Sequence, residues 1–433
     1  MESIILKSID VNKNKVQYNF EFSSKLAEYF NENKLNIEYE ENMEDVPISI
    51  LSVPFVGNVL PIVWLTGAEL YIDELDSRFY NSIPQIKKGY MDMFPEVLFK
   101  GNVNVKKIIE CDRSFIKNKT AMFYSGGVDS TFTLINHLKE NIDLIAVWGS
   151  DVGYFNIEGW TVIKDKLLET IHPYGLKLKV IRSSFRYFDN ESNLNKSFYK
   201  VLKSNWWYGI KHALSLLTHV APLAYLHGYE KMYIASSNCP ETLPDRCASD
   251  MSTDNFVAYG TCQVYHDGFP FDRQEKVERI IEYSNKHNMK INLHVCWENQ
   301  SGNNCCQCEK CYRTMANILA AGADPKDFGF YKYNKTTCLN MRNYLYNKIR
   351  DKEKISDMWP AIQRNVNKNK DHLKTMPYWK YFKWICNADF NNPYSLNVPL
   401  IYRIHNARGI KGKLAEFKLY RYLHQIKFKV IKK

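Results

Sequence analysis

This chain of 433 residues shows neither the wholly apolar run typical of a membrane span nor the pattern typical of an N-terminal leader. No stretch of about 18 residues is uncharged and apolar throughout, so we expect no transmembrane helix. The first residues, MESIILKS, lack the basic region and the long apolar region of a signal peptide. We therefore expect a cytoplasmic protein, in which the eleven cysteines are thiols or metal ligands rather than a disulfide framework.

Histidine and cysteine are scarce in the first part of the chain. Cys111 is the only cysteine among residues 1–120, the first histidine is His137, and residue 2 is Glu2. A glutaminase needs an N-terminal cysteine nucleophile or a Cys–His pair. We therefore exclude a glutaminase from residues 1–115.

Charge is unevenly distributed along the chain, whose net charge is +11. Residues 1–100 carry nine Lys/Arg and sixteen Asp/Glu, a net charge of −7, whereas residues 401–433 carry ten and one, a net charge of +9. The last stretch, Arg403 to Lys433, interleaves its bases with apolar side chains. Such a segment is typical of a packed C-terminal helix with a solvated face, and it also suits an anionic membrane or a nucleic acid.

The strongest local signal is the stretch Tyr124-Ser125-Gly126-Gly127-Val128-Asp129-Ser130-Thr131. The apolar residues Thr120 to Tyr124 predict a buried strand, and the apolar residues after the stretch recur at helical spacing. Adjacent glycines let backbone N–H groups turn inward, and the positive end of the following helix points at the same place, so an anion cradle suited to phosphate is expected. No Gly-Lys-Ser/Thr follows, which excludes a Walker loop.

This stretch resembles the PP-loop, Ser-Gly-Gly-Xaa-Asp-Ser, of the N-type ATP pyrophosphatases, which include asparagine and GMP synthetases, tRNA thiolases and the 7-cyano-7-deazaguanine synthase of queuosine biosynthesis. Members cleave ATP between the α and β phosphates and adenylate a substrate oxygen, and a nitrogen or sulfur nucleophile then displaces AMP. The resemblance implies that Tyr124 to Ser130 bind the pyrophosphate of ATP and its Mg²⁺, with Ser125 and Asp129 at catalytic positions. Without a glutaminase, nitrogen would come from ammonia, an amine or a partner.

Residues 116 to about 300 alternate strand and helix, as in a doubly wound parallel sheet. The predicted strands are Thr120–Tyr124, Leu144–Trp148, Leu176–Ile181, Lys231–Ser236 and Lys290–Val295, and the clearest helix runs from Ile210 to Leu226. Ligands of such sheets bind outside the carboxyl ends of the strands. Ser236 lies at one such end, and by resemblance Gly149, Ser150 and Asp151 frame the adenine and ribose.

A long segment with little periodicity runs from Asn238 to Asp272, and a loop of this length suggests a lid or a substrate-binding loop. The residues that we assign to substrate binding are Asn238, Asp250, Asp254, His266 and Asp267. Arg273 and Lys276 follow at the start of a helix, where they would neutralise a carboxylate or pyrophosphate. A surface pair of cations is the alternative for these two.

The second strong signal is a cysteine cluster between Cys296 and Cys311. Thiolates so close in sequence give tetrahedral metal coordination at little cost in chain entropy. The spacing resembles the zinc site of 7-cyano-7-deazaguanine synthase, which implies the ligands Cys296, Cys305, Cys308 and Cys311 and a structural Zn²⁺. Cys306 stands at the glycine position of that family, which leaves open whether Cys306 replaces Cys305. An iron–sulfur cluster is the alternative metal group.

The expected fold is therefore α/β, a doubly wound parallel sheet like that of the adenine nucleotide alpha hydrolases. We expect an N-terminal α+β module over residues 1–115, a PP-loop domain with its four-cysteine metal site over 116–325, and a mostly helical, basic extension over 326–433. Within the first module, Ile48–Val53 and Val59–Leu65 are predicted strands, and Leu26–Tyr29 and Ser82–Phe94 are predicted helices.

The resemblance covers about residues 118–325 and is to a longer, divergent relative of 7-cyano-7-deazaguanine synthase. It implies a ligase that uses ATP, Mg²⁺ and Zn²⁺ to adenylate a carboxylate or amide oxygen and to install nitrogen as an amide, nitrile or conjugate. The expected acceptor is a small carboxylate or a modified base, with a protein or a glycan as an alternative, and a homodimer is a further expectation. The competing hypotheses are an RNA thiolase and a nucleotide-binding partner protein without turnover.

Overall fold

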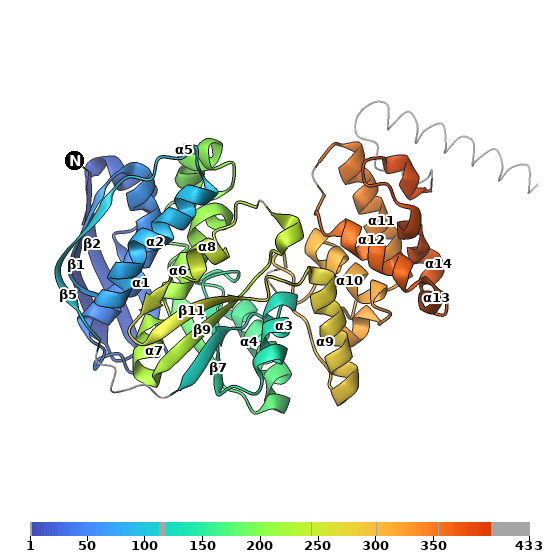
Figure 1. The fold of residues 1–433 in the computed structure, drawn as a ribbon, viewed down its shortest axis with the longest axis horizontal. Helices are drawn as coiled ribbons and strands as arrows, with labels where there is room; N and C mark the ends of the chain where they lie inside the picture. The colour runs from blue at the N-terminus through green and yellow to red at the C-terminus, as the bar shows by residue number, and fades with distance from the viewer. Residues whose placement is uncertain (1, 112–117, 244, 300, 354, 400–433) are drawn as a thin grey trace, which may run out of the picture. The chain divides into compact units, whose positions relative to one another are not determined.

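The computed structural model describes residues 2–111, 118–243, 245–299, 301–353 and 355–399 (Figure 1). The chain divides into two compact units, Met1–Asn303 and Asn304–Lys433. We predicted that the basic tail from Arg403 to Lys433 is a packed helix or binds an anionic membrane or a nucleic acid. This tail lies outside the described residues.

The first unit is built on one mixed sheet of eleven strands, in the order β10-β11-β9-β6-β7-β8-β3-β2-β1-β4-β5. The strands are β1 (Ser3–Asn12), β2 (Lys15–Phe22), β3 (Lys34–Glu38), β4 (Glu69–Asp76), β5 (Asn102–Ile109), β6 (Lys119–Phe123), β7 (Ile142–Trp148), β8 (Leu178–Ser183), β9 (Tyr229–Ala235), β10 (Ala258–Tyr259) and β11 (Cys262–Asp267). The fold is thus α/β, as expected. Because β3 pairs with β8, the strands before and after residue 115 belong to the same sheet.

Five neighbouring strands, β11-β9-β6-β7-β8, are all parallel. The chain runs outward from β6 through β7 to β8 and then returns to the other side of β6 as β9. The predicted strands at Thr120, Leu144, Leu176 and Lys231 are confirmed as β6, β7, β8 and β9. The reversal of strand order therefore lies at β6, the strand that leads into the glycine loop.

Both faces of these parallel strands are buried, which explains their nearly continuous apolar sequences. Ala121, Ile145 and Ile181 belong to one hydrophobic core. Met122, Leu144 and Val180, which alternate with them, belong to a second core that contains the side chains of α4. The loops at the carboxyl ends of the strands are thus held between two packed layers.

The helices of the first unit are α1 (Ile48–Thr66), α2 (Ser77–Met93), α3 (Val128–His137), α4 (Ile157–Ile171), α5 (Glu191–Leu202), α6 (His212–Thr218), α7 (Ala221–His227), α8 (Met251–Asp254) and α9 (Arg273–His287), with shorter turns η1 (Ser24–Tyr29), η3 (His172–Tyr174), η4 (Trp207–Lys211) and η5 (Pro240–Thr242). The predicted helices at Leu26–Tyr29 and Ser82–Phe94 are confirmed as η1 and most of α2. The predicted helix Ile210–Leu226 is divided among η4, α6 and α7.

Two predicted strands, Ile48–Val53 and Val59–Leu65, are wrong, because both lie in the single helix α1. This helix is buried on nearly every side and contains Pro54 and Pro61. A helix buried all round has no polar face and therefore no helical period in its sequence. Among the described residues, α1 alone is long and apolar enough to cross a membrane, but 89% of that stretch is buried inside the protein, as in a core helix.

A third predicted strand, Lys290–Val295, is also wrong, because this segment has no regular secondary structure. The fifth parallel strand is instead β11, which lies inside the stretch that we predicted to be an aperiodic loop. That stretch also holds α8 and β10. The pairing of β11 with β9 gives this part of the chain its regular structure.

In the described part of the second unit, the regular secondary structure is helical. It comprises α10 (Glu309–Ala320), α11 (Lys335–Arg350), α12 (Trp359–Lys368), α13 (Lys370–Leu373) and α14 (Trp379–Phe382), with the turns η6 (Pro325–Phe328), η7 (Lys383–Asn387) and η8 (Pro393–Leu396). Trp359, Ile362 and Val366 of α12 are almost completely buried. The predicted domain boundaries near residues 115 and 325 remain predictions.

Candidate functional site

The glycine loop joins the end of β6 to the start of α3, with Gly127 as the residue that precedes the helix. Gly126 has φ +71°, and a Cβ there would come within 2.8 Å of the Leu167 side chain. Only glycine fits this left-handed turn without strain. The first backbone N–H groups of α3 have no partner within the helix, as at the start of any helix.

Two hydroxyl groups lie inside the loop. Ser125 Oγ and Ser130 Oγ are 3.2 Å apart, and the Gly127 amide lies 3.4 Å from Ser125 Oγ. Ser130 Oγ in turn donates to the Gly127 carbonyl. The two hydroxyls therefore lie at the N-terminus of α3, and the N-terminus of a helix favours a bound anion.

Two cations from α9 meet the single carboxylate of the loop. Arg273 Nη2 lies 2.6 Å from Asp129 Oδ2, and Lys276 Nζ lies 3.5 Å from Asp129 Oδ1. Both cationic side chains are almost fully buried, and Lys276 also donates to the Ser236 carbonyl at 2.7 Å. The structure thus brings together Asp129, Arg273, Lys276 and Ser236, which are far apart in the sequence.

Two cations face the Asp129 carboxylate, and the Asp267 carboxylate is close enough for Lys276 to help lower its pKa. Burial lowers the pKa of Lys276, the Asp129 carboxylate opposes that shift and the Arg273 guanidinium adds to it. The buried Nε of Arg273 has no hydrogen-bond partner in the described part of the chain. Buried cations beside a helix N-terminus favour a bound anion.

A cavity of about 630 Å³ opens beyond the ends of β7 and β8. Its walls are the loop after β7 and the start of α5 with the loop before it: Gly149, Ser150, Asp151, Gly153, Tyr154, Phe155, Asn156, Arg186, Tyr187 and Glu191. Gly149 has φ +114°, and a Cβ there would meet the Ser183 carbonyl at 2.0 Å. The three residues assigned to adenine and ribose therefore line a hollow rather than a flat surface.

Arg186 connects the two walls of this cavity. Its guanidinium donates to the Ser150 carbonyl at 3.1 Å and to Glu191 at 2.9 Å, and it stacks on the Trp207 ring at 4.1 Å. Sequence reasoning did not select Arg186 or Glu191. The only available signal was their position after a predicted strand.

The residues assigned to substrate binding occupy several environments. Asp250 caps α8 through the Ser252 amide, and Asp254 is buried and accepts hydrogen bonds from Ser249 and His266. Asn238 is buried beside Ser236, whose hydroxyl donates to the Asn238 carbonyl. Because Asp250 and Asp254 already have partners within the segment, their first role is to shape it.

Asp267 lies in a network that sequence reasoning did not find. Its carboxylate accepts from Thr133 at 2.7 Å and contacts His137 at 3.2 Å, and His137 also contacts Glu140 at 2.6 Å. Burial raises the pKa of Asp267, but its hydrogen bonds with His137 and Thr133 outweigh burial and leave it below the ordinary value. The network ties α3, which carries the glycine loop, to the end of β11.

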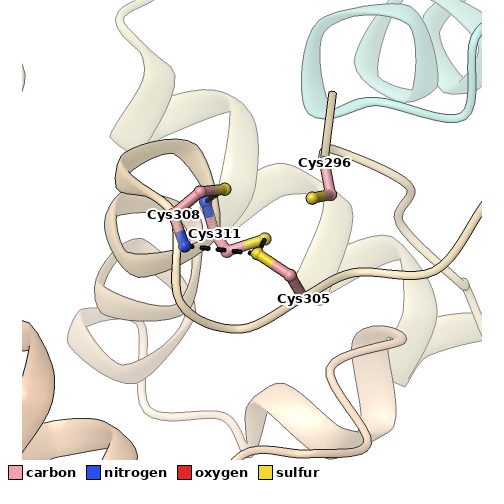
Figure 2. A group of neighbouring side chains, drawn as sticks. All are labelled: Cys296, Cys305, Cys308 and Cys311. Atoms are coloured by element: carbon pink, nitrogen blue, oxygen red, sulfur yellow. Dashed lines mark hydrogen bonds between the residues drawn. The ribbon is translucent and has the colours of Figure 1, made fainter. Parts of the chain in front are cut away.

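The four predicted metal ligands converge on one point. The Sγ atoms of Cys296, Cys305, Cys308 and Cys311 all lie within 4.8 Å of one another, and Figure 2 shows their side chains directed at a common centre. Tetrahedral zinc with Zn–S bonds of about 2.3 Å requires sulfurs about 3.8 Å apart. The cluster can therefore hold a metal ion such as zinc.

Backbone amides surround these sulfurs. The amides of Gln307 and Cys308 lie 3.3 and 3.2 Å from Cys305 Sγ, and the Cys311 amide lies 3.4 Å from Cys308 Sγ. Hydrogen bonds of this kind favour the thiolate that a metal requires. None of the eleven cysteines forms a disulfide.

Cys306 is not a member of this cluster. Its backbone has φ +58°, and its Sγ lies 3.8 Å from the Asn304 carbonyl. This left-handed backbone conformation is one that glycine adopts without strain. The structure thus groups Cys305, and not Cys306, with the other three cysteines.

Three comparisons with known proteins give no relative for this chain: no family model, no curated protein and no solved structure matches it. Its function must therefore be argued from the two sites described above.

Proposed function

We propose that this protein is an ATP-dependent, ligase-like enzyme that releases AMP and pyrophosphate. In this proposal it adenylates a carboxylate or amide oxygen of an acceptor, and a nitrogen nucleophile then displaces AMP. The observation that carries the proposal is the convergence of Arg273 and Lys276 on Asp129 at the N-terminus of α3.

The strand order supports the proposal. The order of the parallel strands reverses at β6, and in doubly wound sheets ligands bind at such a reversal, outside the carboxyl ends of the strands. The glycine loop follows β6 at this place. We infer that the fold is a doubly wound sheet of the PP-loop kind and that the loop binds pyrophosphate.

The chemistry of ATP cleavage explains why buried cations are needed. Breaking the bond between the α and β phosphates leaves negative charge on pyrophosphate as it departs. Arg273 and Lys276 are fixed by burial before the reaction, so they can stabilise this charge without reorganising. Ser125 and the N–H groups at the start of α3 would orient the same phosphates.

Magnesium fits the loop only together with a nucleotide. Asp129 is the one carboxylate of the glycine loop, and Mg²⁺ is usually held by one or two carboxylates plus substrate phosphates. When bound, the ion would neutralise phosphate charge. Asp129 would then exchange part of its contact with Arg273 and Lys276 for the metal, which frees both cations to face the phosphates.

The cavity beyond β7 and β8 would receive the rest of ATP. Gly149, Ser150 and Asp151 line it, together with the aromatic rings of Tyr154, Phe155 and Tyr187. Aromatic faces stack on a nucleobase, and Asp151 would accept hydrogen bonds from ribose hydroxyls. The cluster of four cysteines would hold a structural zinc ion, because all four positions around the metal are occupied by protein.

The test is to incubate the protein with ATP, Mg²⁺, ammonia and candidate carboxylates and to measure AMP and pyrophosphate. We expect Asp129→Ala and Lys276→Met to reduce their formation at least about 100-fold, the usual effect of removing one group that stabilises transition-state charge. Lys286→Met is the matched control, since Lys286 is an exposed lysine in the last turn of the same helix. Formation of ADP and phosphate instead would contradict the proposal.

A further inference from the structure

The second unit carries a concentration of exposed basic side chains between residues 364 and 383. All six Lys and Arg residues of this stretch are exposed: Arg364, Lys368, Lys370, Lys374, Lys380 and Lys383. The stretch contains one acidic residue, Asp371, which pairs with Lys374 at 2.7 Å. In the described part of the chain, Lys368, Lys370 and Lys383 take part in no ion pair.

Four of these bases belong to α12 and to two elements that contact it, α13 and η7. Gln363 donates to the Ile385 carbonyl at 2.8 Å, and Asn367, one turn later, donates to the Cys386 carbonyl at 3.2 Å. These two contacts fix the side of α12 that borders η7. Arg364 and Lys368 are four residues apart, so both bases lie on one face of α12, beside the face that borders η7.

Two more bases belong to the elements that contact α12. Lys383 is the first residue of η7, and Lys370 opens α13 and is close enough to lower the pKa of Cys386, which burial raises. We name the four residues Arg364, Lys368, Lys370 and Lys383 the basic strip. The strip takes its positive charge from α12, α13 and η7, and α13 and η7 both contact α12.

The strip has no apolar anchor. The large apolar side chains of these elements are buried, namely Ile362, Val366, Leu373, Phe382, Trp384 and Ile385. A helix that lies in a membrane interface needs exposed apolar residues beside its bases. A protein interface needs a buried apolar centre. A surface with charge alone fits a partner that is recognised through regularly spaced phosphates.

We propose that the basic strip binds the phosphate backbone of RNA. This inference is independent of the proposed ATP chemistry, because it uses other residues and another part of the chain. Contacts with phosphates carry no sequence information, so the strip would position an RNA without selecting its sequence. The affinity would fall steeply with salt as counterions are released.

The experiment measures the affinity of the full chain for a fluorescein-labelled oligouridylate over a series of salt concentrations. The test variant is Lys368→Glu/Lys370→Glu/Lys383→Glu. The control variant is Lys326→Glu/Lys332→Glu/Lys335→Glu, three exposed lysines of the same unit. Both variants change the net charge of the protein equally, so a difference between them reports on the position of the charge.

We expect the test variant to bind at least about tenfold more weakly and to show a salt slope shallower by about two, since each phosphate contact with a single strand contributes about 0.7. The control variant should stay within about twofold of the wild type. Equal loss in both variants would overturn the inference, because net charge alone would explain it. Unchanged RNA binding in the test variant, or binding through the strip to phosphatidylserine vesicles and not to RNA, would overturn it as well.

Discussion

At the scale of single residues, the informative position is Cys306. Its φ of +58° places it in a region that costs a residue with a Cβ roughly 1–2 kcal/mol. The neighbouring Cys305 supplies a sulfur to the cluster, and Cys306 does not. The two adjacent cysteines therefore have different roles, although their side chains are chemically identical.

We expect Cys305→Ser to lose the bound metal and Cys306→Ser to retain it. Cys306→Gly should raise the free energy of unfolding by about 1 kcal/mol, because glycine removes the strain of the left-handed turn. Elemental analysis of zinc and urea unfolding measure the two effects. Retention of zinc by Cys305→Ser, together with its loss from Cys306→Ser, would reverse the assignment of the ligand.

At the scale of elements, the network of His137, Glu140 and Asp267 holds α3 in place. Burial lowers the pKa of His137, but hydrogen bonds with both carboxylates outweigh burial and raise it above the ordinary value. Burial raises the pKa of Glu140, yet its contact with His137 leaves it below the ordinary value. The His137 ring also stacks on Tyr233, at 4.0 Å between centroids.

These shifts predict a pH window for the stability of α3. The raised pKa of His137 stabilises the fold below the unfolded value of about 6.5, and this contribution is lost as pH rises through the folded value. The lowered pKa values of Glu140 and Asp267 stabilise the fold above about 4, and this contribution is lost as pH falls. The network should therefore contribute most between about pH 4 and 6.5.

We expect His137→Gln to lower the free energy of unfolding by up to about 1 kcal/mol more at pH 5.5 than at pH 9, the range of a partly exposed ion pair. Urea unfolding at the two pH values measures this difference. His172→Gln is the control, since His172 is exposed. An equal loss at both pH values would show that His137 acts through packing and not through charge.

Element by element, the sequence predicts what has a strong local pattern. The strands β6, β7, β8 and β9 are short apolar runs between turn signals, and they are found in this way. The strand β11 is missed because its sequence, CQVYHD, is half polar and its order comes from pairing with β9. The helix α1 is misread because burial on all sides removes the period that marks a helix.

The residues of the candidate site also divide into those that a local sequence pattern predicts and those that it does not. The glycine loop and the cysteine cluster are contiguous in sequence, so their residues are recognised from spacing. Arg273 lies 144 residues from Asp129, and no local pattern predicts that the two side chains touch. The network of His137 with Asp267 is missed for the same reason, because it joins residues 130 apart.

At the scale of the whole molecule, a zinc ion held by the four cysteines would contribute to the stability of the fold. Binding free energy at a structural zinc site is also folding free energy, because the unfolded chain holds no such site. The four ligands lie within one segment of the chain, residues 296–311. Because metal binding contributes to folding, loss of one thiolate should lower the free energy of unfolding of the protein.

We expect the purified protein to be colourless, to contain about one zinc ion per chain and to unfold at a lower temperature after treatment with a strong chelator. Cys308→Ser should be insoluble, whereas Cys386→Ser, outside the cluster, should be soluble. Elemental analysis, an absorption spectrum of anaerobically purified protein and thermal unfolding are the measurements. A brown protein with stoichiometric iron and sulfide would contradict the zinc assignment and favour the RNA thiolase hypothesis.

The irregular segment before Cys296 is hydrogen-bonded to the glycine loop. The His294 amide donates to the Gly126 carbonyl at 2.7 Å. This hydrogen bond joins the glycine loop to the chain two residues before Cys296, the first cysteine of the cluster. Exchange of this amide with deuterium requires a local opening of that hydrogen bond. The exchange rate of the His294 amide should therefore report on both sites. It should rise when the metal is removed and fall when an anion binds to the glycine loop.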